Sequence, residues 1–356
     1  MTKKRIGVLT SGGDCAGLNA CIRSLVLHAK GSYGWDVFGI RNGTLASPVY
    51  ALELDENMCS TAMMRSGGTI LGSTNRTAPV FNGDDAPSDY AKDFIKGYHE
   101  LGLDALIGIG GDGSMKILRN LAQIGNLNLV TIPKTIDNDL GHTEMAIGFT
   151  TAVEVATEAL DRLQATAASH QRVMILEVMG RDAGHIALNA GLAGGADVIL
   201  MPEIPYTVAG ICDHIKKIQK NGRNFALIIV AESVKKESGE PATVHKEGDR
   251  TRYGGIGHYL NERIENCINA ETRVTVLGHV QRGGQPAAWD RIIASALGMG
   301  AVDLVYKQKY DHMVAWSNRK IIEVPIQDAI DRYQAVQKKD ILVKTAQGLG
   351  TYVGKV

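Results

Sequence analysis

The stretch Ala105-Leu106-Ile107-Gly108-Ile109-Gly110-Gly111-Asp112-Gly113-Ser114 decides the fold class of this chain. Residues 105–109 form an apolar run, which is typical of a strand buried on both faces of a sheet. A glycine-rich turn follows the run at once, and a helical pattern follows the turn. A strand that passes through such a turn into a helix is the repeating unit of α/β proteins with parallel sheets.

The same unit recurs along most of the chain. Further apolar runs predict strands at residues 5–10, 37–41, 127–132, 173–178, 198–201, 225–230 and 274–277. Amphipathic stretches between these runs, such as 148–168 and 287–306, predict helices. We therefore predict an α/β fold of two doubly wound, Rossmann-like domains with mainly parallel sheets. Such sheets bind ligands beyond the carboxyl ends of their strands.

A chain of 356 residues is long enough for two domains. We place the first domain at residues 1–140 and the second at 141–310, after which the chain is expected to return to the first domain. Residues 311–356 are expected to form a C-terminal extension. The polar stretch 235–252 contains Gly239, Pro241 and Gly248, and it predicts a long surface loop.

The composition limits the class of partner. Basic and acidic residues number 38 each, and this balance argues against a nucleic acid or an anionic membrane as the main partner. No apolar run approaches the roughly 18 residues that span a bilayer, and the first residues do not resemble a signal peptide. The five cysteines are scattered without paired spacing. We therefore expect reduced thiols in a cytoplasmic protein, without a disulfide or a zinc site.

The glycines of the opening stretch are compatible with two classes of enzyme. Gly108, Gly110 and Gly113 satisfy the pattern G-x-G-x-x-G, which is typical of dinucleotide-binding dehydrogenases. Such an enzyme needs an acidic residue after the next strand to hold the ribose, whereas this strand ends in Pro133-Lys134-Thr135. Asp112 would repel a bare pyrophosphate, but it suits a metal ion that bridges to phosphates. Asp112 therefore favours phosphoryl transfer from a metal–nucleotide complex.

A second glycine loop follows the first predicted strand. Its sequence is Thr10-Ser11-Gly12-Gly13-Asp14-Cys15-Ala16-Gly17. Glycines before a helix let backbone N–H groups approach an anion, although an ordinary strand-to-helix turn has the same composition.

A charged loop, Pro133-Lys134-Thr135-Ile136-Asp137-Asn138-Asp139, follows the strand at 127–132. One carboxylate can accept the proton of an attacking hydroxyl, and the other can orient a cation. In isolation the segment would be interpreted as a solvated turn with an Asp helix cap. It is not isolated, because the loop at 110–114 is expected at a neighbouring strand end.

Basic residues lie near the ends of two later strands. They are His170, Arg172, Arg181, Arg273, His279 and Arg282. The guanidinium fork binds phosphate through two hydrogen bonds, so this set suits a sugar phosphate, although each arginine alone is more typical of a surface ion pair. Glu232 ends another strand, where a carboxylate accepts hydrogen bonds from sugar hydroxyls or stabilises a helix N-terminus.

These segments together resemble the 6-phosphofructokinases, from residue 5 to about residue 304. The resemblance rests on residues 10–20, 67–72, 110–114, 133–139, 169–172, 179–184 and 278–284, in the order that the family has them. It implies two Rossmann-like domains with the active site in the cleft between them. Residues 1–140 would bind the phosphoryl donor and residues 141–310 the sugar phosphate. It further implies transfer of a phosphoryl group to the 1-hydroxyl of fructose 6-phosphate in glycolysis, with Mg²⁺ as cofactor.

The resemblance also implies roles for individual residues. Asp137 is expected to be the general base, Asp139 and Arg181 to assist catalysis, and Asp112 to hold the metal. The expected donor-binding residues are Gly13, Arg76, Gly111, Asp112, Gly113, Ser114 and Lys134. The expected substrate-binding residues are Thr135, Ile136, Asp137, Arg172, Met179, Gly180, Arg181, Glu232, Arg273, His279 and Arg282. Arg172 and Arg273 match residues that reach in from a neighbouring subunit, which implies a homodimer or homotetramer with shared active sites.

Two positions bear on the identity of the donor. Lys134 stands where the bacterial ATP-dependent enzymes usually have glycine and the pyrophosphate-dependent relatives have lysine. Gly113 stands where those relatives have an acidic residue. The chain therefore resembles an ATP-dependent subgroup that has both glycine and lysine. We expect ATP as donor, with pyrophosphate as the alternative.

Two further departures concern the donor phosphate and regulation. An arginine that usually follows Gly72-Ser73 is replaced by Asn75, next to Arg76. Arg23 matches one arginine of the effector-binding pattern of the allosteric bacterial enzymes, but Leu27 stands where that pattern has its second arginine. The usual control by ADP or phosphoenolpyruvate is therefore not expected. A non-catalytic paralogue that only binds sugar phosphate is a further alternative; it should have lost Asp137 or Asp112, and both are present.

Overall fold

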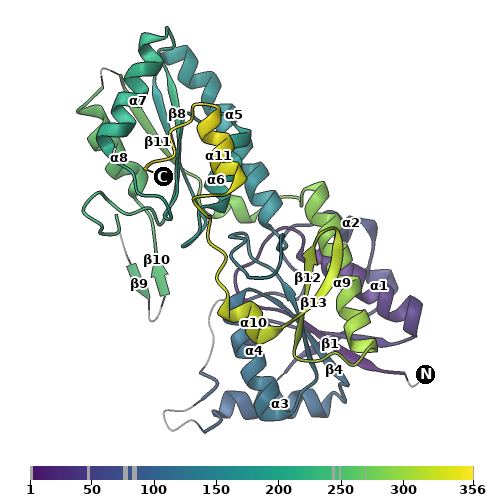
Figure 1. Ribbon diagram of the computed structural model, residues 1–356. Coiled ribbons are helices and arrows are strands. Elements are labelled where there is room, and N and C mark those ends of the chain that lie inside the picture. Colours follow the sequence, from purple (N-terminus) through teal and green to yellow (C-terminus); the bar gives the residue numbers. More distant parts are fainter. Residues whose placement is uncertain are drawn as a thin grey trace. The chain divides into compact units, whose positions relative to one another are not determined.

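The computed structural model describes residues 3–45, 49–74, 79–81, 86–242, 245–247, 250–268 and 270–355. Two compact units are formed by non-contiguous segments of the chain (Figure 1). Unit 1 contains residues 1–151 and 282–333, and unit 2 contains residues 152–281 and 334–356. These boundaries differ from those expected at residues 140 and 310. The first crossing falls inside a continuous helix, α5 (Phe149–His170), where composition gives no sign of a boundary.

Unit 1 is built on a seven-stranded sheet. The strand order is β13 (Lys320–Pro325), β12 (His312–Ser317), β5 (Leu129–Pro133), β4 (Ala105–Gly110), β1 (Arg5–Thr10), β2 (Asp36–Ile40) and β3 (Ala51–Leu54). The edge strands β13 and β3 are antiparallel to their neighbours, and the other pairs are parallel. Strand β4 is buried along its whole length, as the opening apolar run predicts.

Helices cover both faces of this sheet. Helices α1 (Leu18–Tyr33) and α9 (Ala288–Tyr306) pack together on one face (Figure 1). Helices α3 (Asp89–Glu100), α4 (Asp112–Gly125) and α10 (Ile326–Asp331) lie on the other, where Phe94, Leu118 and Ile326 belong to one buried apolar cluster. The short helix α2 (Thr61–Arg65) packs against α1.

Unit 2 has a four-stranded sheet in which every pair is parallel. The order is β11 (Thr272–Val276), β6 (Val173–Val178), β8 (Ala226–Ala231) and β7 (Val198–Leu200). Helices α7 (Val208–Lys220) and α8 (Ile256–Glu265) pack together, and α6 (His185–Ala193) packs against α11 (Ile341–Gly348). The two sheets confirm the expected α/β class with mainly parallel strands. In the described part of the chain, no helix has the length and apolar character that a membrane span needs.

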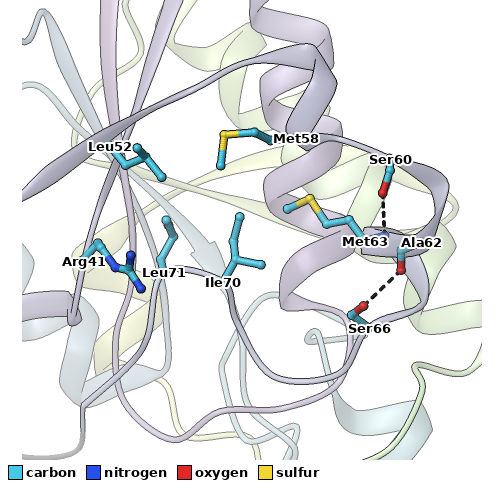
Figure 2. Close-up of a pocket in the computed structure, with 9 residues that line it drawn as sticks. All are labelled: Arg41, Leu52, Met58, Ser60, Ala62, Met63, Ser66, Ile70 and Leu71. Carbon is cyan, nitrogen blue, oxygen red and sulfur yellow. Dashed lines mark hydrogen bonds between the residues drawn. The ribbon is translucent and has the colours of Figure 1, made fainter.

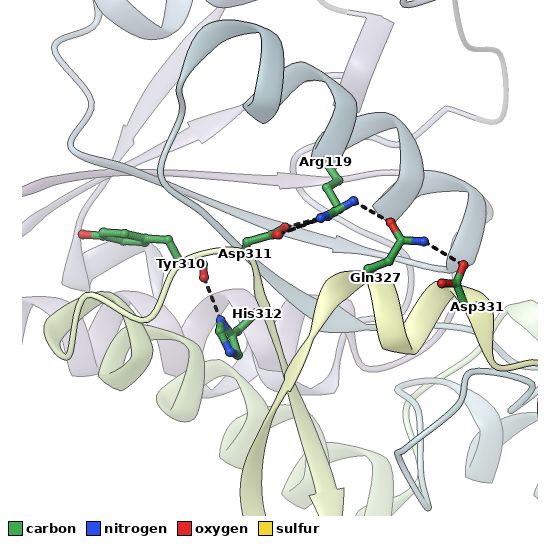
Figure 3. Close-up of polar contacts among 6 residues, drawn as sticks. All are labelled: Arg119, Tyr310, Asp311, His312, Gln327 and Asp331. Atoms are coloured by element: carbon green, nitrogen blue, oxygen red, sulfur yellow. Dashed lines mark hydrogen bonds and ion pairs between the residues drawn. The ribbon is translucent and has the colours of Figure 1, made fainter.

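The segment after residue 310 is part of the two units, whereas we expected a C-terminal extension. Strand β12 extends the sheet beside β5, and residues 334–356 belong to unit 2. Polar contacts tie this segment to α4: Arg119 Nε donates to Asp311 Oδ1 at 2.8 Å, and a second guanidinium nitrogen reaches Gln327 (Figure 3). Gln327 Nε2 in turn donates to Asp331 Oδ1 at 2.7 Å.

Two other expectations are corrected by the structure. The stretch 235–252 includes a two-stranded antiparallel ribbon, β9 (His245–Glu247) with β10 (Arg250–Arg252), and is therefore not an irregular loop throughout. Cys212 and Cys267 form a disulfide, although all five cysteines were expected to be reduced. Their separation of 55 residues gives no sign of pairing, but Cys212 lies on α7, Cys267 lies two residues after the end of α8, and these helices pack together.

Candidate active site

Three predicted loops of unit 1 leave the same edge of its sheet. Strands β5, β4 and β1 are adjacent, and their last residues are paired, Thr10 with Ile109 and Gly110 with Pro133. The N–H of Lys134 donates to the carbonyl of Gly110 at 3.0 Å, which holds the charged loop beside the glycine loop. The loops at 11–17, 111–114 and 134–139 therefore meet, as their positions after parallel strands predict.

Two cations flank Gly13 in the first loop. Lys134 Nζ donates to the carbonyl oxygen of Gly13 at 2.5 Å, and Arg282 Nη1 donates to the carbonyl of Asp14 at 3.1 Å. A Cβ at Gly13 would lie 2.8 Å from Arg282 Nη1, so the guanidinium group would have to shift to accommodate any other residue there. Lys134 is buried, and its desolvation lowers the pKa of its ammonium group. The structure thus brings Arg282, expected among the sugar-phosphate ligands, to the predicted donor loop.

The second glycine loop forms the start of α4. Gly111 is the residue before the helix, Asp112 lies in its first turn and is exposed, and Ser114 is buried. Nothing lies within 4 Å of the position that a Cβ would take at Gly113, so space is open beside Asp112. The described residues contain no group of three or more His, Cys, Asp or Glu side chains arranged around a metal.

The charged loop holds its carboxylates with its own threonine. Thr135 Oγ1 donates to Asp139 Oδ1 at 3.2 Å and lies 3.5 Å from Asp137 Oδ2, while the N–H of Asp137 donates to Thr135 Oγ1 at 3.1 Å. Asn138 adopts a left-handed conformation with φ 53°, and its side chain bonds the backbone of Glu144 and Ala146. Asp137, Asn138 and Asp139 are all buried. Ile136, also in this loop, is buried as well.

The remaining predicted substrate residues belong to unit 2 and form two groups. Met179, Gly180 and Arg181 follow β6, Glu232 follows β8 and His279 follows β11, so this first group lies at the carboxyl edge of three adjacent strands. The N–H of Arg181 donates to Glu232 Oε1 at 3.2 Å, which joins two of these strand ends.

The second group, Arg172 and Arg273, lies at the opposite, amino edge of the same sheet. Arg172 immediately precedes β6, and Arg273 is the second residue of β11. Because β6 has six residues, Arg172 and Met179 are separated by about 20 Å of strand. Both arginines form ion pairs with Glu271. Residue 76, the remaining predicted donor ligand, lies outside the described residues.

Sequence reasoning missed a buried residue that supports the carboxyl edge. Gln281 is 1% exposed, and its Oε1 accepts a hydrogen bond from the N–H of Met179 at 2.7 Å. Its place in the motif at 278–284 was noted, but a glutamine that bonds the backbone has no characteristic spacing. Gln281 lies in the short turn Gly278–Arg282 between β11 and α9, and its sequence neighbours Val280 and Arg282 give no signal of this contact.

Unit 1 also contains a cavity of about 500 Å³ that the sequence did not predict (Figure 2). It is mostly apolar, with Leu52, Met58, Met63 and Ile70 among its lining residues, and Arg41 points toward it from the end of β2. Among the predicted site residues that the structure describes, none lines this cavity.

Comparison with known proteins identifies the family of this chain. A family model described as Phosphofructokinase matches residues 5–305, nearly the span of the resemblance. The chain belongs to the phosphofructokinase family. Within this family, the ATP-dependent 6-phosphofructokinase 1 of Nostoc sp. strain PCC 7120 is 59% identical over 359 residues, 99% of each chain. The protein of the same name from Synechocystis sp. strain PCC 6803 is 56% identical and covers 99% of this chain and 98% of the relative.

A solved phosphofructokinase has the same fold. The crystal structure of Pichia pastoris phosphofructokinase in the T-state matches with a TM-score of 0.80 at 28% identity. The match covers 93% of this chain and 36% of that one. This chain therefore spans about a third of the length of that phosphofructokinase.

Proposed function

We propose that this protein is an ATP-dependent 6-phosphofructokinase, which transfers a phosphoryl group from ATP to the 1-hydroxyl of fructose 6-phosphate in glycolysis. The observation that carries the proposal is the full-length identity of 59% to a relative named for this activity. The geometry agrees, because the loop with two buried carboxylates meets two glycine loops, and Lys134 and Arg282 bind carbonyl oxygens of the first of them.

The residues of the charged loop divide the chemistry between them. The oxygen of the sugar 1-hydroxyl bonds to the terminal phosphorus of ATP, the bond from that phosphorus to the bridging oxygen breaks, and Asp137 takes the hydroxyl proton. Thr135 links Asp137 and Asp139, so the two carboxylates keep a fixed spacing. Lys134 and Arg282, which flank Gly13, balance the negative charge of the donor phosphates.

We infer that Mg²⁺ is the cofactor and that Asp112 holds it. Mg²⁺ is commonly bound by one or two carboxylates together with substrate phosphates, and it neutralises their charge when bound. The exposed carboxylate of Asp112 beside the open space at Gly113 fits that donor set. The remaining ligands would come from the nucleotide.

We further infer that the active sites are shared between copies of the chain. Arg172 and Arg273 lie on the edge of the sheet opposite to Met179, Arg181 and Glu232, separated by about 20 Å of strand. One sugar phosphate is too small to contact both edges. A homodimer or homotetramer would let the two arginines serve the ligand of a neighbouring copy.

The cytoplasm is the proposed location, because the substrates of glycolysis are found there. The dehydrogenase alternative has little support, since Pro133-Lys134-Thr135 provides no acidic residue for a ribose. A non-catalytic paralogue is disfavoured by the presence of both Asp137 and Asp112.

The proposal is tested by assaying the purified protein with fructose 6-phosphate and Mg²⁺, offering ATP or pyrophosphate separately. We expect turnover with ATP and a fall in kcat of about 10² to 10⁴ in Asp137→Asn, because a positioned base contributes that much. Calorimetric binding of fructose 6-phosphate to the variant controls for folding. A higher kcat/KM with pyrophosphate would contradict the donor, and a loss below about tenfold would contradict the base.

A further inference from the structure

Glu271 lies between the two arginines at the amino edge of the unit 2 sheet. Strands β6 and β11 are adjacent and parallel, with Val173 opposite Thr272. The N–H of Val173 donates to the carbonyl of Glu271 at 3.0 Å, so the backbone holds Glu271 beside the start of β6. Neither the motifs of the sequence nor the proposed reaction gives Glu271 a role.

The Glu271 carboxylate is bound by both guanidinium groups at once. Arg172 Nε donates to one carboxylate oxygen and Arg273 Nη2 donates to the other. Arg273 Nη1 also donates to the carbonyl of Thr272 at 2.8 Å, which fixes this guanidinium from a second side. In a single copy of the chain, the side chains of Arg172, Glu271 and Arg273 are 26%, 43% and 52% exposed, so a ligand at this edge of the sheet can reach the cluster.

Two guanidinium groups that converge on one pair of oxygens form a typical phosphate site. A carboxylate presents its two oxygens to such a pair much as a phosphate does. In this chain the acceptor position between the arginines is therefore taken by a side chain. A phosphate that needs the same N–H groups must compete with it.

We propose that Glu271 is an internal competitor for this phosphate position, and that a sugar phosphate must displace it to bind Arg172 and Arg273. The inference rests on the proposed function, which assigns these arginines to fructose 6-phosphate. Glu271 is thus a residue that sets affinity, and it does not take part in phosphoryl transfer. Glu271 directly precedes β11, so its side chain stays close to the two arginines even when a phosphate displaces it.

The charges of the cluster show whether neutralising Glu271 should strengthen or weaken phosphate binding. With Glu271 ionised, two guanidinium groups face one carboxylate, and neutralising Glu271 removes both the competitor and its repulsion of an incoming phosphate. Exposed ion pairs contribute little to stability, so displacement of Glu271 is feasible and the change in phosphate affinity should be several-fold. The effect should also shrink at high ionic strength, because these side chains are exposed to solvent.

The test compares Glu271→Gln with Glu262→Gln, which removes the same charge from an exposed position on α8. In Glu271→Gln we expect the KM for fructose 6-phosphate to fall at least about threefold, a change within the range measured for exposed ion pairs, while kcat stays near the wild-type value. Competitive inhibition by inorganic phosphate should strengthen by a similar factor. Glu262→Gln should match the wild type in both measurements, and thermal melting checks that each variant folds.

The outcomes separate this inference from the proposed function. An unchanged or raised KM in Glu271→Gln would overturn the inference, since it would mean that Glu271 is inert or only positions the arginines. If the protein does not phosphorylate fructose 6-phosphate at all, the proposed function fails. Calorimetric titration with inorganic phosphate then decides the inference alone: tighter binding to Glu271→Gln than to Glu262→Gln supports it, and equal binding overturns it.

Discussion

We assign Lys134 and Gly113 different effects on the proposed donor site, because Lys134 provides a buried charge and Gly113 provides space. The Lys134 ammonium group is desolvated, which lowers its pKa, and it bonds the carbonyl of Gly13. Gly113 has nothing within 4 Å of a Cβ position, at the start of α4. The sequence predicted that both residues follow strand ends. It could not predict that Lys134 reaches back to the first loop, because that direction depends on packing.

We predict that Gly113→Asp lowers kcat/KM for ATP far more than Lys134→Met does. An aspartate fits the open space without a clash, so the variant should fold, but its carboxylate would take up room and repel the phosphates next to Asp112. Lys134→Met keeps the volume of a buried side chain and removes its charge together with its hydrogen bond to the carbonyl of Gly13. We expect a loss of at least about tenfold for Gly113→Asp, equivalent to about 1.4 kcal/mol.

The control for this prediction is Gly31→Asp, which adds the same side chain on α1, where a Cβ also meets nothing within 4 Å. Steady-state kinetics with ATP and with pyrophosphate should be measured for all three variants. A larger loss in Lys134→Met than in Gly113→Asp would show that charge, and not space, decides the donor.

The elements that the sequence predicted best are the strands buried on both faces. Strands β4, β5, β6 and β8 are fully buried, so their sequences are mostly apolar, with Thr131 in β5 and Glu177 in β6 as the exceptions. Edge strand β13 was missed because its residues are largely exposed and its sequence, Lys320-Ile321-Ile322-Glu323-Val324-Pro325, is mixed. Strand β12 pairs with β13 and was missed with it. The disulfide was missed for another reason. Its two cysteines are 55 residues apart in the sequence, and only the packing of α7 against α8 brings them together.

We predict that the Cys212–Cys267 disulfide stabilises the packing of α7 against α8. Closing a loop of 55 residues restricts the unfolded chain, and such cross-links typically contribute about 2–4 kcal/mol to the free energy of unfolding. Equilibration with a thiol reductant should therefore lower the melting temperature. The other cysteines, at 15, 21 and 59, are free and buried, and burial raises the pKa of the Cys15 thiol to about 12.

Cys212→Ala is the matched variant, because it cannot form the cross-link. Its melting temperature should equal that of the reduced wild type and should not respond to reductant. A wild-type melting temperature that is the same with and without reductant would contradict the prediction, provided that thiol titration confirms reduction.

At the scale of the whole molecule, the polarity of the unit 2 sheet is the feature that bears on assembly. All four strands are parallel, so its carboxyl edge and its amino edge carry different residues. The sequence predicted the strands near whose ends both groups of residues lie, but it made no prediction of the order of these strands in the sheet. It did not predict the domain boundaries, because α5 crosses from one unit to the other without a break. The separation of Arg172 and Arg273 from Arg181 follows from strand direction alone.

We predict that two inactive variants restore activity when their subunits exchange. In a shared site, Asp137 comes from one copy and Arg172 from another. A mixed dimer of Arg172→Ala with Asp137→Asn then contains one intact site and one site that has lost both residues. Random exchange in equal amounts gives mixed dimers half of the time, so about a quarter of the wild-type activity should return.

The matched control is a mixture of Arg172→Ala with Arg273→Ala. Both arginines lie on the same edge of one sheet and come from the same copy, so no site in a mixed dimer contains both. No activity should return in this mixture. Recovery in neither mixture, after mass spectrometry confirms exchange, would mean that each copy binds its ligand alone.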